Sequence, residues 1–254
     1  MPETRTWDGK SYDRISGPME ALGLEVLSRL ELKGDELVLD AGCGSGRITQ
    51  ALIERVPEGH VVAADASASM VAAARERLPG ADVRQVDLLD LDLEALGLER
   101  PFDAILSTAT FHWILDHERL FARLHGALRP GGRLLAQCGG AGNIDVLRGH
   151  ANDVLAREPY AAAFAGFRSP WNYATPQDTR ERLIAAGFEQ ADCWLQPAPK
   201  QPEEPREFLT SIVLGPHYQH LPEELREPFM DDVLAELGEP VVVDYVRLNI
   251  DATA

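Results

Sequence analysis

The sequence predicts an α/β fold built around a mostly parallel sheet. Between residues 20 and 138, short apolar runs alternate with segments whose apolar residues recur at helical spacing. Two of these runs, Leu37–Leu39 and Val61–Ala64, are apolar throughout, which is typical of strands buried on both faces. Strands that alternate with helices favour right-handed crossovers and a parallel sheet with helices on both faces.

Length and composition narrow the class of protein. The chain has 254 residues, 45% hydrophobic and 26% charged, which is ordinary for a globular protein and excludes a disordered one. The formal net charge of −17 makes nucleic acid and membrane surfaces poor partners, because both carry negative charge. With no long apolar run and no signal-peptide pattern, we expect a cytoplasmic protein that does not enter the membrane. The 3 cysteines form no metal-binding or disulfide pattern, so no metal is expected.

The first predicted elements are a helix and two strands. Apolar residues four apart predict the leading amphipathic helix, namely Leu22, Val26 and Leu30. Leu37–Leu39 predicts a strand that ends at Asp40 and a glycine cluster. Val61–Ala64 predicts the next strand, and either Ser67 or Ser69 can cap the helix after it.

Three further strands are predicted at residues 83–86, 102–106 and 133–137. The apolar residues of a helix lie between the last two strands, namely Leu120, Phe121, Leu124 and Leu128. The run Arg129-Pro130-Gly131-Gly132 ends this helix, because proline and glycine cannot continue it.

The second half of the chain carries two insertions into this pattern. We interpret residues 139–175 and 203–238 as a helical cap on a single domain that spans residues 1–254. Residues 1–18 are interpreted as a lid segment, because Trp7 and Tyr12 lie where no regular element needs them. These two aromatic residues could close over a cofactor or simply anchor the terminus.

Between and after the insertions the sheet pattern returns. Thr175-Pro176 predicts a helix start, since threonine caps helices and proline suits the first helical position, and Gly187 predicts its end. Residues 188–195 predict a strand, and residues 241–250 predict a long final strand.

A glycine-rich loop joins the first strand to the next helix. Residues Asp40–Gly46 have the sequence Asp-Ala-Gly-Cys-Gly-Ser-Gly, and glycines there allow positive φ angles and the close approach of a ligand. Asp65 ends the second strand, where a carboxylate can accept both hydroxyls of a ribose. The alternative interpretation is a tight turn next to a solvated aspartate.

Details of the loop favour S-adenosylmethionine over a dinucleotide. In the pattern Gly-x-Gly-x-x-Gly the sixth position is glycine, whereas here Gly46 comes one position early and Arg47 is sixth. Asp87 ends the third strand, so it lies with Asp40 and Asp65 at one edge of the sheet. Three carboxylates would repel a pyrophosphate, but they suit a sulfonium and an ammonium group.

These motifs resemble those of class I S-adenosylmethionine-dependent methyltransferases. The residues that carry the resemblance are Val38–Gly46, Asp65, Met70, Asp87 and Leu128–Gly132. Two further stretches, Ser107–His117 and Trp171–Gly187, are similar to the trans-aconitate methyltransferase group of small-molecule methyltransferases. The resemblance implies a Rossmann-like sheet of seven strands, in which the last strand inserts antiparallel between the fifth and the sixth.

The resemblance also implies residues for the methionine end of S-adenosylmethionine. Gly42 and Gly44 would approach the methionine moiety, and Asp40 would help to bind its ammonium group. Ser107, at the end of the fourth strand, would lie beneath the same moiety.

Other residues are implied for the nucleoside end. Asp65, with its neighbour Ala66, would bind the ribose hydroxyls. Met70 would pack on the adenine, although its spacing also suits core packing in its helix. Asp87 and Leu88 would face the adenine edge.

His112 is the candidate catalytic residue, because it follows the fourth strand at the edge where this type of sheet binds ligands. It could act as a base toward an amine or a hydroxyl, or as a neutral donor toward a carboxylate. It could also be a structural histidine of the cofactor loop. His117 is predicted on the surface, in the first turn of a helix.

Aromatic and polar residues that could line an acceptor pocket are Trp113, Trp171, Tyr173, His217 and Tyr218. Since the cap needs a core of its own, part of this set is also expected to be structural. Cations that could meet an anionic acceptor are Arg14, Arg168, Arg206 and Arg247, but they form no cluster in the sequence.

The leading hypothesis is therefore methyl transfer from S-adenosylmethionine to a small organic acceptor, with carboxylates among the candidates. One alternative is methylation of a hydroxyl or an amine with His112 as the base. Two others are oxidation with NAD(P) and a non-catalytic module that binds S-adenosylmethionine. The NAD(P) alternative is disfavoured by Arg47 and by the lack of a hydride-transfer motif.

Overall fold

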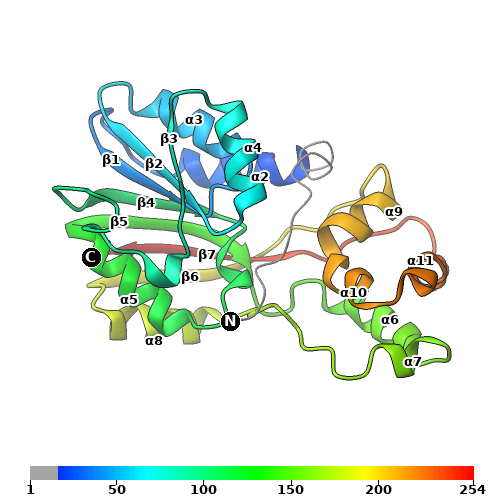
Figure 1. The fold of residues 1–254 in the computed structure, drawn as a ribbon. Coiled ribbons are helices and arrows are strands. Elements are labelled where there is room, and N and C mark those ends of the chain that lie inside the picture. The colour runs from blue at the N-terminus through cyan, green and yellow to red at the C-terminus, as the bar shows by residue number, and fades with distance from the viewer. Residues whose placement is uncertain (1–16) are drawn as a thin grey trace.

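A seven-stranded sheet forms the centre of the protein, as a computed structural model that describes residues 17–254 shows (Figure 1). The strands are β1 Leu37–Ala41, β2 His60–Asp65, β3 Asp82–Gln85, β4 Phe102–Thr108, β5 Leu128–Gly139, β6 Gln190–Pro197 and β7 Val246–Thr253. Their order across the sheet is β3-β2-β1-β4-β5-β7-β6. Only the pairings of β7 are antiparallel, so the predicted Rossmann-like sheet is confirmed, with the last strand between the fifth and the sixth.

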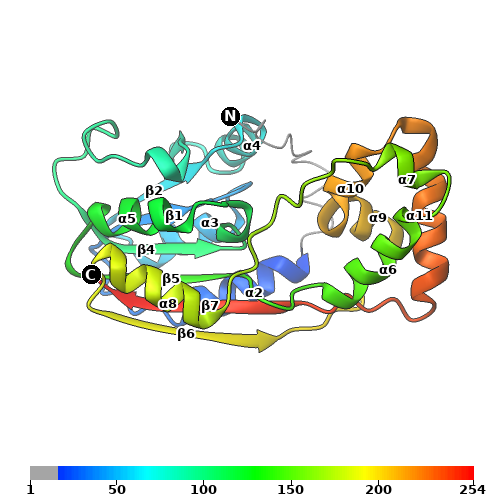
Figure 2. The same ribbon diagram turned by 90° about the horizontal axis from the view of Figure 1, so that it is seen from below.

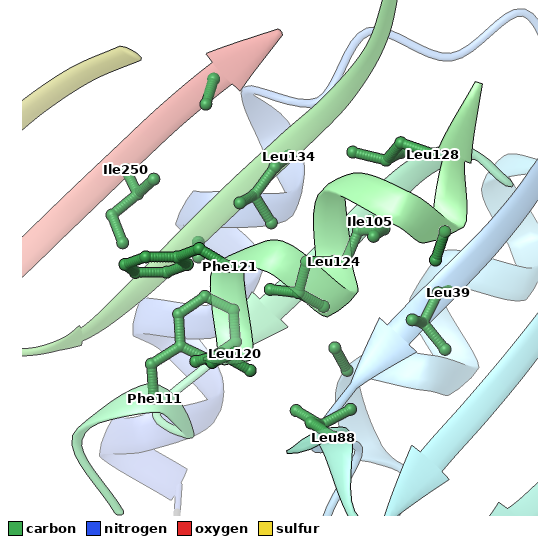
Figure 3. Packing of buried hydrophobic residues seen from close by; sticks show 14 of the residues in the cluster. Leu39, Leu88, Ile105, Phe111, Leu120, Phe121, Leu124, Leu128, Leu134 and Ile250 are labelled. Atoms are coloured by element: carbon green, nitrogen blue, oxygen red, sulfur yellow. The ribbon is translucent and has the colours of Figure 1, made fainter. Parts of the chain in front are cut away.

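Helices cover both faces of this sheet. They are α2 Gly17–Ser28, α3 Arg47–Arg55, α4 Ala68–Arg77, α5 His117–Ala127 and α8 Pro176–Ala186, with the short turns η1 Leu88–Asp90 and η2 Phe111–Trp113. Successive side chains of β1 go to opposite faces: Leu39 packs with α5, and Val38 packs with α2 and α3. On the α5 face, the core contains Leu120, Phe121 and Leu124 (Figure 3).

The helix ends follow the predicted capping residues. Ser67 Oγ accepts a hydrogen bond from the Met70 N–H and caps α4. Thr175 Oγ1 accepts one from the Asp178 N–H at 3.1 Å and caps α8. Gly187, with φ of 111°, ends α8 in the left-handed conformation that glycine adopts without strain. Ser67 and Thr175 fix the points at which α4 and α8 begin, and Gly187 fixes the point at which the chain leaves α8 for β6.

The two insertions form a helical cap beyond the end of the sheet at which β4 and β5 finish (Figures 1 and 2). Its helices are α6 Asp145–Leu155, α7 Tyr160–Ala163, α9 Pro205–Phe208, the π-helical η3 Leu209–Val213, α10 Gly215–His220 and α11 Glu223–Leu237. They share an apolar core of their own, with Leu147, Phe208 and Phe229 at its centre. The predicted helical cap is therefore confirmed.

Three local predictions were wrong. Leu128 and the run Arg129–Gly132 belong to β5 and not to the end of the preceding helix, which finishes at Ala127. The final strand begins at Val246 and not at residue 241, because Val241, Val243 and Tyr245 are buried in the cap core instead. His117 is buried and not on the surface, since its Nε2 pairs with the Phe111 carbonyl at 3.0 Å. The burial of Val241, Val243 and Tyr245 in the cap core, and that of His117, depends on tertiary contacts that the local spacing of residues does not encode.

Trp7, Tyr12, Arg14 and the lid segment as far as residue 16 lie outside the described residues. Within residues 17–254, no helix is long and apolar enough to cross a membrane. The same part of the chain holds no group of three or more metal-binding side chains placed around a common point.

Candidate functional site

A cleft of about 1410 Å³ lies between the edge of the sheet and the cap. The sheet side is formed by residues that follow β1, β2 and β4, and by η1. The cap side is formed by Gly166, Phe167, Arg168, Pro170, Pro216, Gln219 and His220. Because parallel strands present their carboxyl ends at this edge, the cleft lies where an α/β sheet of this type binds ligands.

The glycine loop between β1 and α3 forms one wall of the cleft. Gly42 has a φ of 84°, and a Cβ on it would lie 2.1 Å from Thr110 Oγ1. Gly44 has a φ of 54°, but nothing lies within 4 Å of the position a Cβ would take. Position 42 therefore requires glycine, because a side chain there would collide with Thr110. At position 44 the glycine leaves space beside the backbone that a ligand can use.

Asp65 lies at the end of β2, beside the glycine loop. Its Oδ2 accepts a hydrogen bond from the Gly44 N–H at 3.0 Å, and its Oδ1 accepts one from the Ser67 N–H at 2.8 Å. Burial raises the pKa of the carboxyl, and the two amide hydrogen bonds oppose this rise. Each carboxylate oxygen can accept a further hydrogen bond, so Asp65 can still bind a pair of ligand hydroxyls.

Asp40 and Ser107 lie behind the loop and are not part of the cleft lining. Asp40 is 1% exposed, and its Oδ2 accepts a hydrogen bond from Thr49 Oγ1 at 2.6 Å. Its Oδ1 has no hydrogen-bond partner in the part of the chain that the structure describes. Burial raises the pKa of Asp40 to about 6, against the hydrogen bond from Thr49. Ser107 Oγ donates to the Ala41 carbonyl at 2.6 Å, which ties β4 to β1.

The sheet side of the cleft is suited to S-adenosylmethionine. Asp65 places a carboxylate in the cleft. The unsatisfied Asp40 Oδ1 lies behind the glycine loop, where its negative charge favours a cation bound on the other side of the loop. Ala66, Met70 and Leu88 add a largely apolar surface for a flat ring. The pattern of carboxylates and apolar walls fits a cationic nucleoside better than it fits a pyrophosphate.

Asp87 lines the same cleft from the start of η1. It is exposed, and its Oδ1 accepts a hydrogen bond from the Leu89 N–H at 2.9 Å. The side chain therefore holds η1 in place while its second oxygen remains available at the cleft.

His112 is 8% exposed and lies in η2, directly after β4. Its Nδ1 accepts a hydrogen bond from the Gly139 N–H at 3.3 Å, so in the neutral ring the proton is on Nε2. Burial lowers the pKa of His112 well below its usual value, and the positive charges of Arg247 and His117 lower it further. The residue is therefore a neutral hydrogen-bond donor near pH 7.

Aromatic rings connect the cleft with His112 and the cap. Trp113 lines the cleft, and its ring centroid lies 5.8 Å from that of Trp171 and 5.1 Å from that of His112. Trp171 in turn lies 5.9 Å from Tyr173 and 5.5 Å from His217. Four of the five predicted acceptor residues thus form one cluster with His112.

The segment that carries Trp171 and Tyr173 is held against η2 by its backbone. The Asn172 N–H donates to the His112 carbonyl at 2.9 Å, and Asn172 Nδ2 donates to the Leu115 carbonyl at 3.1 Å. Burial lowers the pKa of His217 to about 4, with the charge of Arg148 acting in the same direction. His217 is therefore neutral near pH 7, like His112.

Tyr218 does not join this cluster. Its hydroxyl donates to Glu227 Oε1 at 2.5 Å, and its ring faces the Arg226 guanidinium. Of the predicted cations, Arg168 lines the cleft, but Arg206 is paired with Glu227 and Asp231 among the cap helices. Tyr218 and Arg206 therefore serve the cap.

Sequence reasoning missed Thr110 and Arg148. Thr110 Oγ1 donates to the Gly42 carbonyl at 3.1 Å and fixes the loop after β4 against the glycine loop. The Arg148 guanidinium carbon lies 5.8 Å from the Tyr173 ring centroid. The charges of Arg148 and Arg247 both lower the pKa of this tyrosine. No local signal in the sequence indicates that Thr110 packs on Gly42. None indicates that Arg148 on α6 comes near the end of β7.

Comparisons with known proteins agree with this geometry. A family model described as a methyltransferase domain matches residues 38–132. A trans-aconitate 2-methyltransferase from Variovorax paradoxus is 39% identical over 247 residues, which are 95% of this chain and 93% of that protein. One from Azoarcus sp. is 36% identical over 167 residues, 65% of this chain, but the match spans only 62% of that protein's length.

Among solved structures, phosphoethanolamine N-methyltransferase 2 of Haemonchus contortus, in complex with S-adenosylhomocysteine, has the same fold. Its TM-score is 0.59 at 19% identity, over 97% of this chain and 56% of that one. Likeness at this level of identity concerns the fold. The family is shown by the sequence identity with the Variovorax protein, which extends along nearly the whole of both chains. On this ground the chain belongs to the S-adenosylmethionine-dependent methyltransferases.

Proposed function

We propose that the protein transfers a methyl group from S-adenosylmethionine to a carboxylate of a small acceptor held between the sheet and the cap. The Variovorax and Azoarcus relatives carry the name of an enzyme that acts on a carboxylic acid. The cap in this proposal consists of residues 139–175 and 203–238 of a single domain, residues 1–254.

The observation that carries the choice of a carboxylate is the state of His112. Its Nδ1 lone pair is engaged by the Gly139 N–H, and burial lowers its pKa well below the usual value. A hydroxyl or amine acceptor must lose a proton and needs a base, whereas a carboxylate is already ionised near pH 7. A neutral Nε2–H suits the carboxylate, because it can donate a hydrogen bond to an oxygen of the acceptor.

In this proposal the cofactor binds along the glycine loop. Asp65 and Ala66 bind the ribose, and Met70, Asp87 and Leu88 surround the adenine. Gly44 leaves room for the methionine moiety, and Gly42 allows the loop to pack closely against Thr110 beside it. Asp40 and Ser107 support that moiety from behind the loop. When bound, S-adenosylmethionine supplies a methyl carbon to which an acceptor oxygen bonds as the S–C bond breaks, with the electron pair going to sulfur and no proton moving.

The protein's own contribution is chiefly to position the acceptor and to exclude water. Trp113 lines the cleft, and the Trp171, Tyr173 and His112 rings pack behind it. In this proposal the acceptor reaches the Nε2–H of His112 from the side of Trp113. A small acceptor is favoured over nucleic acid because the net charge is −17. A cytoplasmic location suits the three free cysteines, Cys43, Cys138 and Cys193.

Two substitutions at His112 test the proposal. His112→Gln keeps a side-chain N–H donor but cannot act as a base, and His112→Phe keeps only the ring volume. We expect His112→Gln to retain activity toward carboxylic acids within about 10-fold, and His112→Phe to lose about 10- to 100-fold, as for a lost hydrogen bond to a charged group.

The assay uses S-adenosylmethionine with panels of carboxylic acids, phenols and amines, and it is repeated between pH 6 and pH 9. Binding of S-adenosylhomocysteine serves as the control for folding. Equal loss in both variants, together with turnover only of phenols or amines, would show that His112 is a base and that the acceptor is not a carboxylate.

A further inference from the structure

Arg247 is a buried cation without an anionic partner. It lies on β7, is 4% exposed, and forms no ion pair within residues 17–254. Its Nε is buried and has no hydrogen-bond partner in that part of the chain. A buried guanidinium left unpaired is unfavourable, so the site is incomplete without an anion.

The position of Arg247 follows from the antiparallel insertion of β7. Arg247 pairs with Gly139 across β5 and β7, so it lies at the edge of the sheet where β5 ends. The Gly139 N–H is also the group that donates to His112 Nδ1. Because Gly139 has no side chain, the Tyr173 ring packs against its backbone, where a Cβ would lie 2.7 Å from Tyr173 Cε1.

Hydrogen-bond donors surround this point. The guanidinium carbon of Arg247 lies 5.6 Å from the Tyr245 ring centroid, and Arg148 lies over the other aromatic neighbour, Tyr173. Burial raises the pKa of Tyr173, and a hydrogen bond with the Asn143 side chain and then the charges of Arg148 and Arg247 oppose the rise. The hydroxyl therefore stays protonated, next to Asn143 and within the field of both cations. His112 adds its Nε2–H.

The other arginines near the acceptor cluster differ from Arg247. Arg148 Nη2 is paired with Asp145 Oδ1 at 2.6 Å, and Arg206 is paired with two carboxylates of α11. Arg168 lines the open cleft from the cap. Arg247 combines burial, an unsatisfied Nε and proximity to His112, which together describe a binding position for a carboxylate.

We infer that Arg247 binds a carboxylate of the acceptor other than the one that is methylated. This inference rests on the proposed function, since it presumes an acceptor with at least two carboxylates. Methylation converts a carboxylate into a neutral ester, which cannot pair with a buried guanidinium. A carboxylate that does not react keeps its charge from substrate to product, so Arg247 remains paired throughout.

The test compares wild type with Arg247→Met and Arg247→Lys in binding and turnover. The probes are trans-aconitate and the monomethyl ester that the wild-type enzyme forms from it, titrated into protein saturated with S-adenosylhomocysteine. We expect Arg247→Met to weaken the binding of acid and ester alike, on the order of 10- to 100-fold, and to raise KM accordingly. Arg247→Lys keeps the positive charge without the planar guanidinium, so its affinity for both probes should lie between those of wild type and Arg247→Met.

The matched control is Arg133→Met. Arg133 lies at the far end of the same β5–β7 pairing and is paired with Asp251 at 2.7 Å. It should leave acceptor binding unchanged, and none of the three variants should alter the affinity for S-adenosylhomocysteine. A loss of S-adenosylhomocysteine binding in Arg247→Met would instead indicate a structural role and overturn the assignment.

Other outcomes separate this inference from the proposed function. Wild-type affinity for trans-aconitate in Arg247→Met would refute the role of Arg247 and leave the proposed function intact. Weakened binding of the acid alone, with the ester unaffected, would mean that Arg247 holds the reacting carboxylate, contrary to the inference. Failure of the wild-type protein to form an ester from trans-aconitate or from any other acid with two or more carboxylates would contradict the proposed function, and the assignment of Arg247 would fall with it.

Discussion

At the scale of single residues, two carboxylates beside the glycine loop, the half-buried Asp65 and the buried Asp40, have different roles. Asp65 faces the cleft and is held there by two backbone amides. Asp40 lies behind the loop with one oxygen unsatisfied and a pKa raised by burial to about 6. Such an isolated charge lowers the stability of the free protein and is compensated only when a cation binds.

Asp65→Ala should weaken the binding of S-adenosylhomocysteine by about 10- to 100-fold, because the ribose hydroxyls lose a charged acceptor and the Gly44 N–H loses its partner. Asp65→Asn, which keeps one oxygen, should lose less. Calorimetric titration measures both. Unchanged affinity in Asp65→Ala would show that another group binds the ribose.

Asp40→Asn should stabilise the free protein while weakening its affinity for S-adenosylmethionine. The carboxyl pKa is raised from 3.8 to about 6, so the native state binds this proton more tightly than the unfolded chain does. At pH 7 the charged form therefore opposes folding by up to about 3 kcal/mol, and the penalty shrinks as the pH falls through 6 toward 4.

Denaturant unfolding of wild type and Asp40→Asn at pH 7.5 and pH 4.5 checks this prediction. The gain in stability should be fully present at the higher pH and should fall to about a third of that value at the lower one. A variant that is less stable than wild type at pH 7.5 would mean that Asp40 is satisfied in the free protein.

At the scale of elements, the loop after β1 shows how two glycines of one motif differ. Both have positive φ angles, but Gly42 packs against Thr110 whereas Gly44 has open space beside it. The motif Asp40–Gly46 could be recognised from the sequence because its spacing between a strand and a helix is local. The contact between Gly42 and Thr110 could not, since the two residues lie in loops that follow different strands, β1 and β4.

Gly42→Ala and Gly44→Ala should therefore have different effects. Gly44→Ala should cost about 1–2 kcal/mol of stability for the left-handed backbone, and its methyl group should impede S-adenosylhomocysteine. Gly42→Ala should cost more, because its Cβ would overlap the Thr110 side chain. Thermal unfolding with calorimetric titration measures both effects, and equal destabilisation would contradict the packing described for Gly42.

Element boundaries were predictable where a cap or a breaker marks them. Thr175 and Gly187 bound α8 as their residue types indicate. The start of β7 was not predictable, because apolar residues stand on both sides of Asp244, those before Val246 in the cap core and those after it in the sheet. An apolar pattern indicates that a residue is buried, but it does not indicate whether the residue lies in the sheet core or in the cap core.

At the scale of the whole molecule, the fold places two cores on either side of the acceptor region. The place of the last strand, antiparallel between the fifth and the sixth, was predictable from the resemblance that the motif series carries. The meeting of His112, Tyr173, Arg148 and Arg247 was not, since it depends on how η2, the cap and β7 come together. Residues far apart in sequence carry no shared local signal.

Phe229→Ala in the cap core and Leu124→Ala in the sheet core form a matched pair. Both side chains are fully buried, so the free energy of unfolding should fall by about 3–5 kcal/mol for Phe229→Ala and 2–5 kcal/mol for Leu124→Ala. Only Phe229→Ala should also raise the KM for the acceptor, because the cap forms one side of the cleft. Denaturant unfolding and steady-state kinetics measure the two effects; an equal rise in KM for Leu124→Ala would contradict separate roles for the two cores.

The most direct measurement is the identification of the product formed from S-adenosylmethionine with a deuterated methyl group and trans-aconitate. Mass spectrometry should find one deuterated methyl per acceptor molecule, bound as an ester that alkali hydrolyses. A product whose methyl group resists alkali would place the transfer on another atom. No labelled product from trans-aconitate or from any other carboxylic acid would contradict the account, even if S-adenosylmethionine binds.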